Sequence, residues 1–310
     1  IIFATSAKLL TAFLAAISSK FTGAKLYIDI RDTFSDNFLY FYRWKKRVLL
    51  VSLFLLIENF IIRSSHSINI VSDGFKEAFY GCQEIIKHRK IKVTNFTNGI
   101  TINKVKMIKK YFNKNKKEDC DSYNIIYAGN IGEAQDLISL MTKLNENKKV
   151  LKNMIKSRIK IIIYGSGSQL VFIKKLLEKY KSQKVNLLSE VFSYEGLISR
   201  EQIFENFNKA DCLLLNLGFY KSLSMVIPTK LFEYTATPLP IIFSASGFTK
   251  NFIMNVDGTI YFDNFDPESF LNAINKSMNI NVNVNKRNKF LEKFDSDSIY
   301  KKFAKHLLNK

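Results

Sequence analysis

The 310-residue sequence carries 47 lysine and arginine residues against 27 aspartate and glutamate residues, a formal net charge of +20. Its composition, 47% hydrophobic and 24% charged, is that of a globular protein and excludes a disordered chain. The length allows two domains. The charge indicates an anionic partner, such as a phosphorylated substrate, an acidic lipid surface or a nucleic acid, although lysine is abundant throughout and a general compositional bias explains the charge equally well.

The cysteines Cys82, Cys120 and Cys212 are far apart and odd in number. They match neither the spacing of a metal site nor a disulfide framework, which favours a reducing compartment. Asp119 and Asp121 flank one of them, but they lie in a polar segment and are interpreted as solvated charges. We therefore expect no metal site.

The first hundred residues alternate apolar runs with helical patterns. Strands are predicted at residues 1–4, 24–30, 68–71 and 92–96, and helices over 9–17 and from Phe75. Asp29-Ile30-Arg31-Asp32 closes the second strand, and parallel sheets bind ligands at the carboxyl ends of their strands. Asp32 is therefore either part of a ligand site or the cap of the next helix.

Residues 38–62 form the most apolar stretch of the chain. Its core, residues 48–57, is too short to span a bilayer, and Glu58 interrupts its continuation. The sequence WKKR at 44–47 is the mixture expected at the start of an interfacial helix. The stretch is either a monotopic membrane contact or a buried helix of the first domain.

Residues 101–121 are polar and rich in lysine, which predicts a linker and a domain boundary. The alternative is a solvated helix face followed by a loop. Beyond the boundary, strands are predicted at 124–128, 159–164, 185–188, 212–215, 239–243 and 259–262, with helices between them. This alternation is typical of a parallel, doubly wound sheet. A lysine-rich helix is predicted at 296–308.

Two glycine turns follow predicted strands of this second half. Gly129-Asn130-Ile131-Gly132 lies between a strand and a helix, where glycines let backbone N–H groups approach a phosphate. Gly165 and Gly167 follow the next strand. Plain tight turns would use glycine in the same way.

Residues 226–242, VIPTKLFEYTATPLPII, predict a short helix followed by a strand. Pro228 suits a position just before or in the first turn, and Thr229 can cap the helix. Lys230 and Glu233 are three residues apart and share one helix face. A cation and a carboxylate at a helix N-terminus favour a diphosphate there, whereas an ordinary solvated ion pair is the alternative.

The sequence PTKLFEY at 228–234 resembles the P-S-K-L-F-E-Y signature of retaining nucleotide-sugar glycosyltransferases of family 4, which have the GT-B fold and include many bacterial O-antigen and capsule enzymes. The resemblance implies that Lys230 contacts the donor diphosphate and that Glu233 holds the ribose hydroxyls. Met225 stands where the family often has a second glutamate, which leaves the donor-sugar contact unassigned. Pro238 stands where many members have glycine, which indicates a shifted loop.

Other turns carry the same resemblance. They are DIRD at 29–32, VSDG at 71–74, NGI at 98–100, GNIGEAQ at 129–135, GSGS at 165–168 and GLISREQI at 196–203. The resemblance implies that Gly165 and Gly167 line the donor cleft and that the backbone near Ile198 meets the nucleotide base. Glu133 occupies a position where relatives often have arginine, so we expect diphosphate binding to depend on Lys230 and backbone donors.

The fold implied is α/β, with two Rossmann-like doubly wound parallel-sheet domains facing a cleft. We place an acceptor-side domain over residues 1–115, which the C-terminal helix at 291–310 closes, and a nucleotide-sugar-binding domain over 120–290. Family members begin with elements that are not found here. We therefore expect the first strands of the N-terminal domain to precede residue 1.

The activity implied is a hexosyl or related sugar transfer, with retention, from a nucleotide-diphosphate sugar to a lipid-linked or glycan hydroxyl in O-antigen, lipopolysaccharide or capsule synthesis. Lys230 and the amides of Gly129, Asn130 and Gly132 would stabilise the leaving diphosphate, so we expect no metal and no cofactor. Asp32 is the candidate acceptor-side base, although the departing phosphate can also take the proton.

The partners implied are a nucleotide-sugar, a lipid-linked acceptor and an anionic membrane surface, with the protein on the cytoplasmic face of the membrane. We expect no nucleic acid, because no nucleic-acid-binding motif is found. A catalytically inactive GT-B partner subunit, or a polyanion-binding protein, is the alternative.

Overall fold

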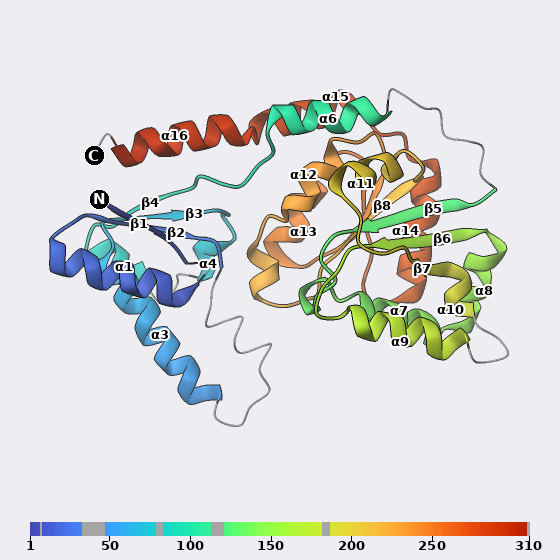
Figure 1. Cartoon of the computed structure of the whole chain (residues 1–310), viewed down its shortest axis with the longest axis horizontal. Helices are drawn as coiled ribbons and strands as arrows, with labels where there is room; N and C mark the ends of the chain where they lie inside the picture. Colours follow the sequence, from blue (N-terminus) through green and yellow to red (C-terminus); the bar gives the residue numbers. More distant parts are fainter. Residues whose placement is uncertain (7, 33–46, 79–82, 113–120, 182–186, 309–310) are drawn as a thin grey trace.

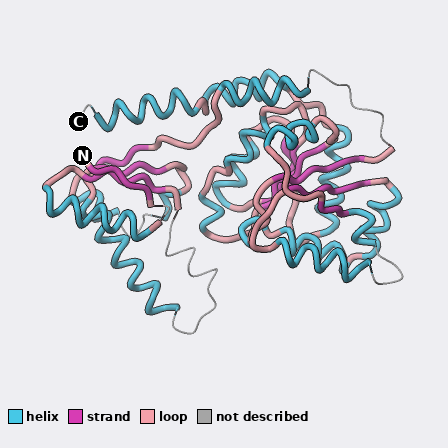
Figure 2. Tube along the Cα trace, viewed as in Figure 1, coloured by secondary structure: helices cyan, strands magenta, loops and turns pink. Residues whose placement is uncertain are grey.

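The computed structural model describes residues 1–6, 8–32, 47–78, 83–112, 121–181 and 187–308. Two separate parallel sheets are each covered by helices (Figures 1 and 2). The first has the strand order β1-β2-β3-β4, and the second has the order β10-β9-β8-β5-β6-β7. The predicted class, α/β with two parallel sheets, is confirmed.

The first sheet is short: its two central strands are fully buried, whereas its two edge strands are partly exposed. Its elements are β1 (Ile2–Thr5), α1 (Leu9–Thr22), β2 (Leu26–Ile30), α3 (Arg47–Ser64), β3 (Ser67–Ile70), α4 (Phe75–Ala78), α5 (Gln83–His88) and β4 (Lys92–Thr94). Ile28 of β2 pairs with Ala4 of β1 and Ile68 of β3, and all three side chains lie in one hydrophobic core. An apolar run on a strand flanked on both sides is what a central parallel strand requires.

The second sheet holds the larger share of the chain. Its strands are β5 (Tyr123–Ala128), β6 (Ile159–Tyr164), β7 (Phe192–Tyr194), β8 (Cys212–Asn216), β9 (Ile241–Ser244) and β10 (Thr259–Tyr261). Numbered within this unit, the strand order is 3-2-1-4-5-6, so the order reverses between β5 and β8. That reversal is the topological switch point at which open α/β sheets bind ligands.

Helices cover both faces of this sheet and pack into two cores. They are η2 (Glu133–Gln135), α7 (Leu137–Glu146), α8 (Lys148–Lys156), α9 (Leu170–Lys181), α10 (Leu187–Val191), α11 (Arg200–Phe207), η3 (Ser222–Met225), α12 (Thr229–Thr235), α13 (Gly247–Met254) and α14 (Pro267–Asn279). The predicted strand at 185–188 is wrong, since Leu187 begins helix α10 and the strand follows at Phe192. Leu188 and Val191, three residues apart, both turn into the core, which a helix allows.

Residues 102–112 are a helix, α6 (Ile102–Phe112), and not a linker. Val105 and Ile108 pack into a core of the second domain, and Tyr111 contacts Phe204 of α11. The alternative interpretation, a partly solvated helix, therefore holds for this segment. The composition misled because lysines fill the outer face and only one narrow face is apolar.

The chain passes between the two units twice, at 99–100 and at 294–296. The Ile100 N–H donates to the Phe294 carbonyl at 3.0 Å, and the Ser296 N–H donates to the Ile100 carbonyl at 3.2 Å. Gly99 has no room for a side chain, because a Cβ there would overlap the Phe294 carbonyl. These backbone hydrogen bonds hold the two crossing segments together.

Helix α15 (Val284–Lys293) comes directly before the second crossing, and α16 (Ser296–Leu308) follows it and extends back over the first unit (Figure 1). Phe303 of α16 stacks on Phe96 with ring centroids 4.9 Å apart and meets Phe3 of β1 edge-on at 5.8 Å. The helix predicted at 296–308 is confirmed, and it covers the first sheet.

Helix α3 has one face in the first core and one face in solvent. Val51, Ile61 and Ile62 are buried, whereas Leu53 and Leu56 are exposed, the latter by 67%. Of the helices in the described ranges, none combines the length and apolar character that crossing a bilayer would need. Residues 38–46 of the predicted interfacial stretch lie outside the described residues.

Candidate functional site

Three glycine loops line the carboxyl edge of the second sheet next to its switch point. Gly129 follows β5, Gly165 follows β6 and Gly196 follows β7. The Gly129 N–H donates to the carbonyl of Tyr164 at 3.0 Å, and the Gly165 N–H donates to the carbonyl of Gly196 at 2.9 Å. The structure therefore brings the predicted donor-side turns into one continuous rim.

The glycines of the second loop serve contacts between loops. Gly165 has φ 132° and Gly167 has φ 158°, and a Cβ on either would overlap a carbonyl of the first loop, that of Gly129 or Ile131. Their lack of a side chain is thus required by the neighbouring loop. Their predicted contact with a donor stays a prediction, as does that of Ile198, which is half-buried at the third loop.

The backbone amides expected to hold a diphosphate are largely in use. That of Gly129 donates to the last carbonyl of β6, that of Ile131 donates to the Ser166 carbonyl in the second loop, and that of Gly132 donates to the Gln135 side chain at 3.1 Å. The Asn130 side chain also donates to Gln135, at 2.9 Å. In the described run only the Asn130 amide has no protein acceptor, and the diphosphate contacts of Gly129, Asn130 and Gly132 stay predictions.

Helix α12 is fixed to β5 by its aromatic residues. Phe232 and Tyr234 are fully buried, and the Tyr234 hydroxyl accepts a hydrogen bond from the Ala128 N–H at 3.2 Å. Pro228 takes the N-cap position and Thr229 begins the helix, so the predicted capping role of Thr229 is wrong. The burial of one face turns the opposite face of α12 toward the rim.

Lys230, on that opposite face, reaches the first glycine loop. Its Nζ lies 3.8 Å from the centroid of the Tyr127 ring, an arrangement in which a cation is attracted to the ring face. A Cβ on Gly129 would lie 2.7 Å from Lys230 Cε and Nζ, so the missing side chain makes the space that the lysine occupies. Burial lowers the pKa of Lys230 to about 7, with the Glu233 charge opposing that shift.

Glu233 lies one turn further along α12 and forms an ion pair with Lys104 of α6. Within the described chain its ion pair is with this lysine and not with Lys230, so the alternative of an ordinary pair within α12 is not what forms. Lys104 was not predicted, because it lies in the lysine-rich segment interpreted as a linker. The periodicity of Ile102, Val105 and Ile108 was the signal that could have placed it on a helix.

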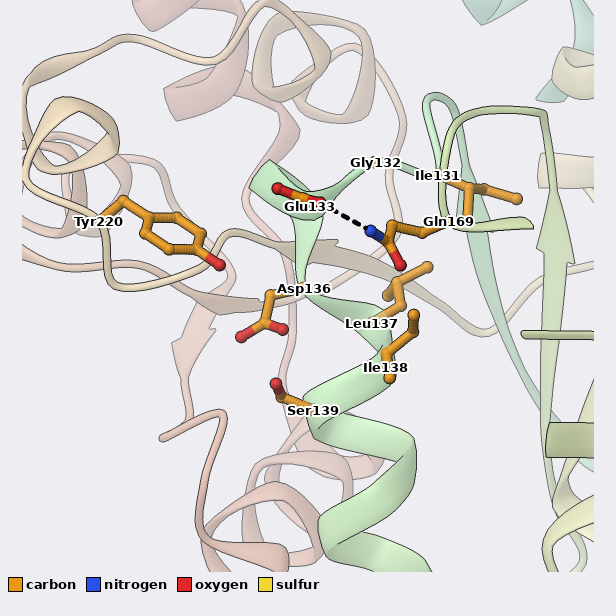
Figure 3. A pocket seen from close by; sticks show the side chains of 9 residues that line it. All are labelled: Ile131, Gly132, Glu133, Asp136, Leu137, Ile138, Ser139, Gln169 and Tyr220. Carbon is orange, nitrogen blue, oxygen red and sulfur yellow. Dashed lines mark hydrogen bonds between the residues drawn. The ribbon is translucent and has the colours of Figure 1, made fainter. Parts of the chain in front are cut away.

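A cavity of about 170 Å³ opens at the same rim, between η2, the start of α7 and the loop after β8 (Figure 3). Its polar lining includes Glu133, Asp136, Ser139, Gln169 and Tyr220, and none of the lysines and arginines in the described ranges lines it. Glu133 Oε1 accepts a hydrogen bond from Gln169 Nε2 at 3.1 Å. Burial raises the pKa of Asp136, whose backbone has φ 45°.

Met225, which replaces an expected glutamate, lies in the hydrophobic core of the first domain. The Ser72 hydroxyl donates to its carbonyl at 2.5 Å, and a Cβ on Gly74 would lie 2.5 Å from the same oxygen. The loop after β8 is therefore seated on the turn after β3. The side chain at this position serves the contact between the domains.

Arg287 of α15 holds the turn that contains Pro238. Its buried guanidinium donates to the carbonyls of Thr237 and Leu239, both at 2.7 Å, and to that of Asp257 at 2.8 Å. These bonds satisfy the carbonyls on both sides of Pro238. Burial lowers the pKa of Arg287 to about 10, with the Asp257 charge opposing the shift.

Asp32 lies at the carboxyl edge of the first sheet, just after β2. Its backbone carbonyl accepts a hydrogen bond from the Ser6 hydroxyl at 3.2 Å. Desolvation raises the pKa of its carboxyl group, and the Arg31 charge opposes this shift. Both carboxylate oxygens of the neighbouring Asp29 accept hydrogen bonds, one from Arg31 Nε at 2.7 Å and the other from Asn69 Nδ2 at 2.7 Å. The role of Asp32 as a base stays a prediction.

Residues 107–294, more than half of the chain, match the family described as glycosyl transferases group 1. The chain belongs to this family. In this glycosyltransferase the match spans the whole second sheet together with Lys230 and Glu233. No curated protein sequence matches the chain.

Three solved structures are among those with the same architecture. Anabaena HepE in complex with UDP and glucose has a TM-score of 0.69 at 13% identity, with 99% of this chain and 77% of that one covered. A sucrose-phosphate synthase from Thermosynechococcus elongatus has a TM-score of 0.66 at 12% identity, with 95% of this chain and 71% of that one covered. A UDP-forming trehalose-phosphate synthase from Burkholderia vietnamiensis has a TM-score of 0.65 at 10% identity, with 96% of this chain and 72% of that one covered. At these identities the likeness shows the fold, and this glycosyltransferase has the GT-B architecture.

Proposed function

We propose that this glycosyltransferase moves a hexosyl or related sugar from a nucleotide-diphosphate sugar to an acceptor hydroxyl, with retention, as family 4 enzymes do. UDP-sugars are the first donors to test, because UDP occurs in the names of the similar structures. The observation that carries the proposal is the position of Lys230. Its amine, whose pKa burial lowers, fills the space over Gly129 at the switch point of the sheet, and the Glu233 carboxylate lies one turn away on α12.

In the proposed reaction the bond between the sugar C1 and the diphosphate oxygen breaks, and its electron pair leaves with the diphosphate. The acceptor oxygen forms the new bond to C1 on the same face, and its proton passes to the departing phosphate oxygen. The Lys230 ammonium faces the charge that develops on the diphosphate, where a positioned cation is most effective. The Glu233 carboxylate accepts hydrogen bonds from the ribose hydroxyls. This arrangement supplies the positive charge without a metal ion, and we propose metal-independent transfer.

We further propose a lipid-linked acceptor of bacterial surface polysaccharide synthesis, reached at the cytoplasmic face of the membrane. An apolar surface on the first domain supports this. Phe13 of α1 and Phe60 of α3 meet edge-on at 5.6 Å, and large side chains beside them are exposed: Leu10, Leu14, Phe21, Leu53 and Leu56. Phe21 is 88% exposed and lies one residue from Lys20, the pairing of apolar and basic groups that suits an anionic interface.

Vesicle flotation tests the membrane contact. The wild-type protein should float with phosphatidylglycerol vesicles and much less with phosphatidylcholine vesicles. Replacing Leu14 and Phe21 by serine should abolish flotation, whereas Phe172→Ser, an exposed residue of α9, should not change it. Equal flotation of both variants would refute the assigned surface.

Release of nucleoside diphosphate tests the transfer itself. The full-length protein should release UDP from at least one UDP-sugar in the presence of membrane lipid extract. Lys230→Ala should reduce the rate by about two orders of magnitude or more, as loss of a charge-stabilising donor does. Unchanged release by a folded Lys230→Ala protein would rule the proposal out.

The burial of Met225 favours one alternative, a catalytically inactive partner subunit, because a carboxylate expected near the donor sugar is absent. Such a subunit would bind a nucleotide-sugar without turning it over. Measured turnover that depends on Lys230 excludes it.

A further inference from the structure

Lys104 connects the chain crossing to the candidate donor site. It lies in the first turn of α6, four residues after Ile100, which is held to the returning strand at Asp295. Its N–H is capped by Thr101 Oγ1 at 3.2 Å. The side chain reaches across to Oε1 of Glu233, so residues 129 positions apart form this ion pair.

The ion pair between Lys104 and Glu233 is partly exposed to solvent. The side chains of Lys104 and Glu233 are 24% and 26% exposed, and α6 itself is immobilised through the fully buried Ile108. A partly desolvated pair on a packed helix is oriented more firmly than a surface pair, whose net contribution is usually small. Lys104 therefore restricts the rotation of the Glu233 carboxylate.

A carboxylate has two oxygens and about four acceptor positions. Lys104 occupies Oε1 of Glu233, and Oε2 has no partner among the described residues. An adjacent pair of hydroxyl groups can therefore donate to the carboxylate without displacing the lysine. A vicinal diol of a nucleoside ribose has this chemistry.

We propose that Lys104 is a positioning residue that holds the Glu233 carboxylate in the orientation that accepts the ribose diol of the donor nucleotide. The inference rests on the proposed function, in which Glu233 contacts the ribose. Lys104 acts through Glu233 and does not touch the ligand. Its effect on affinity should therefore require ribose hydroxyls.

Calorimetric titration with UDP and with 2′,3′-dideoxy-UDP tests this inference. Lys104→Met should weaken UDP binding by about fivefold to tenfold, the loss expected when a hydrogen bond to a charged group is misplaced. It should leave the affinity for the dideoxy ligand unchanged, and Lys104→Arg should restore most of the affinity for UDP. Lys106→Met, which removes the same charge from an exposed position on α6, should affect neither ligand.

An equal loss of affinity for both ligands in Lys104→Met would overturn the inference, because the lysine would then act on the phosphates or on the fold. Equal affinity of Lys104→Met and wild type for UDP would also overturn it. Lys104→Gln provides a second neutral variant should the methionine form unfold. Failure of the wild-type protein to bind UDP, GDP or dTDP would instead refute the proposed function.

Discussion

The titration of Lys230 should make the binding of a nucleotide sugar depend on pH near neutrality. With a pKa of about 7 in the free protein, Lys230 is charged at low pH and neutral at high pH. Only the ammonium attracts a diphosphate. Affinity should therefore fall as pH rises through about 7, and binding should take up a proton, because the bound anion raises the pKa of the amine.

The size of the effect follows from the pKa of Lys230. About 0.9 of the lysine is protonated at about pH 6 and about 0.1 at about pH 8, so the dissociation constant should rise about tenfold, or about 1.4 kcal/mol. UDP-glucose is the suitable probe, since neither of its phosphates carries a second ionisation in this range. Calorimetry in two buffers of different ionisation enthalpy measures the affinity and the proton uptake together.

Two variants isolate the lysine. Lys230→Arg, with a guanidinium that stays charged throughout, should bind with little pH dependence. Lys230→Met should bind weakly at every pH. A wild-type affinity that is constant between about pH 6 and about pH 8 would refute the reasoning, as would a slope that survives in both variants.

Three further outcomes are expected. Arg287→Ala removes the donor of three carbonyls, one buried and two partly buried, and should lower the free energy of unfolding by about 2–4 kcal/mol in urea titrations; a loss below about 1 kcal/mol would contradict the assigned bonds. Met225→Glu buries an unpaired carboxylate between the domains and should cost about 3 kcal/mol or more, whereas Met225→Leu should cost under about 1.5 kcal/mol; equal stability of both would contradict the contact. EDTA should leave UDP release unchanged, and a loss that magnesium restores would refute metal-independent transfer.

Most of the sheets could be predicted because parallel strands are continuous apolar runs. Residues 159–164 were placed to the residue, the helix expected near 296–308 lies there, and the class of fold followed from the alternation of elements. The error at α10 has a local cause, since the run Leu187-Leu188 is equally suited to a strand or to one buried helical turn. Periodicity cannot decide between them over so few residues.

The site was predicted in part. Gly129, Lys230 and Glu233 do lie together, because strand ends and one short helix fix them locally. Lys104 could not be assigned to the site, since its partner lies 129 positions away and the docking of α6 decides the contact. The burial of Met225 likewise depends on how the two domains meet, and local sequence carries no record of that.

The central claim is that Lys230 and Glu233 form the donor site. A crystal structure of the complex with UDP tests it most directly. The account predicts the diphosphate within about 3 Å of Lys230 Nζ, with the ribose hydroxyls on Glu233 and the Lys104 ion pair intact. UDP bound elsewhere on the chain, with Lys230 Nζ still in contact with the face of the Tyr127 ring, would contradict it.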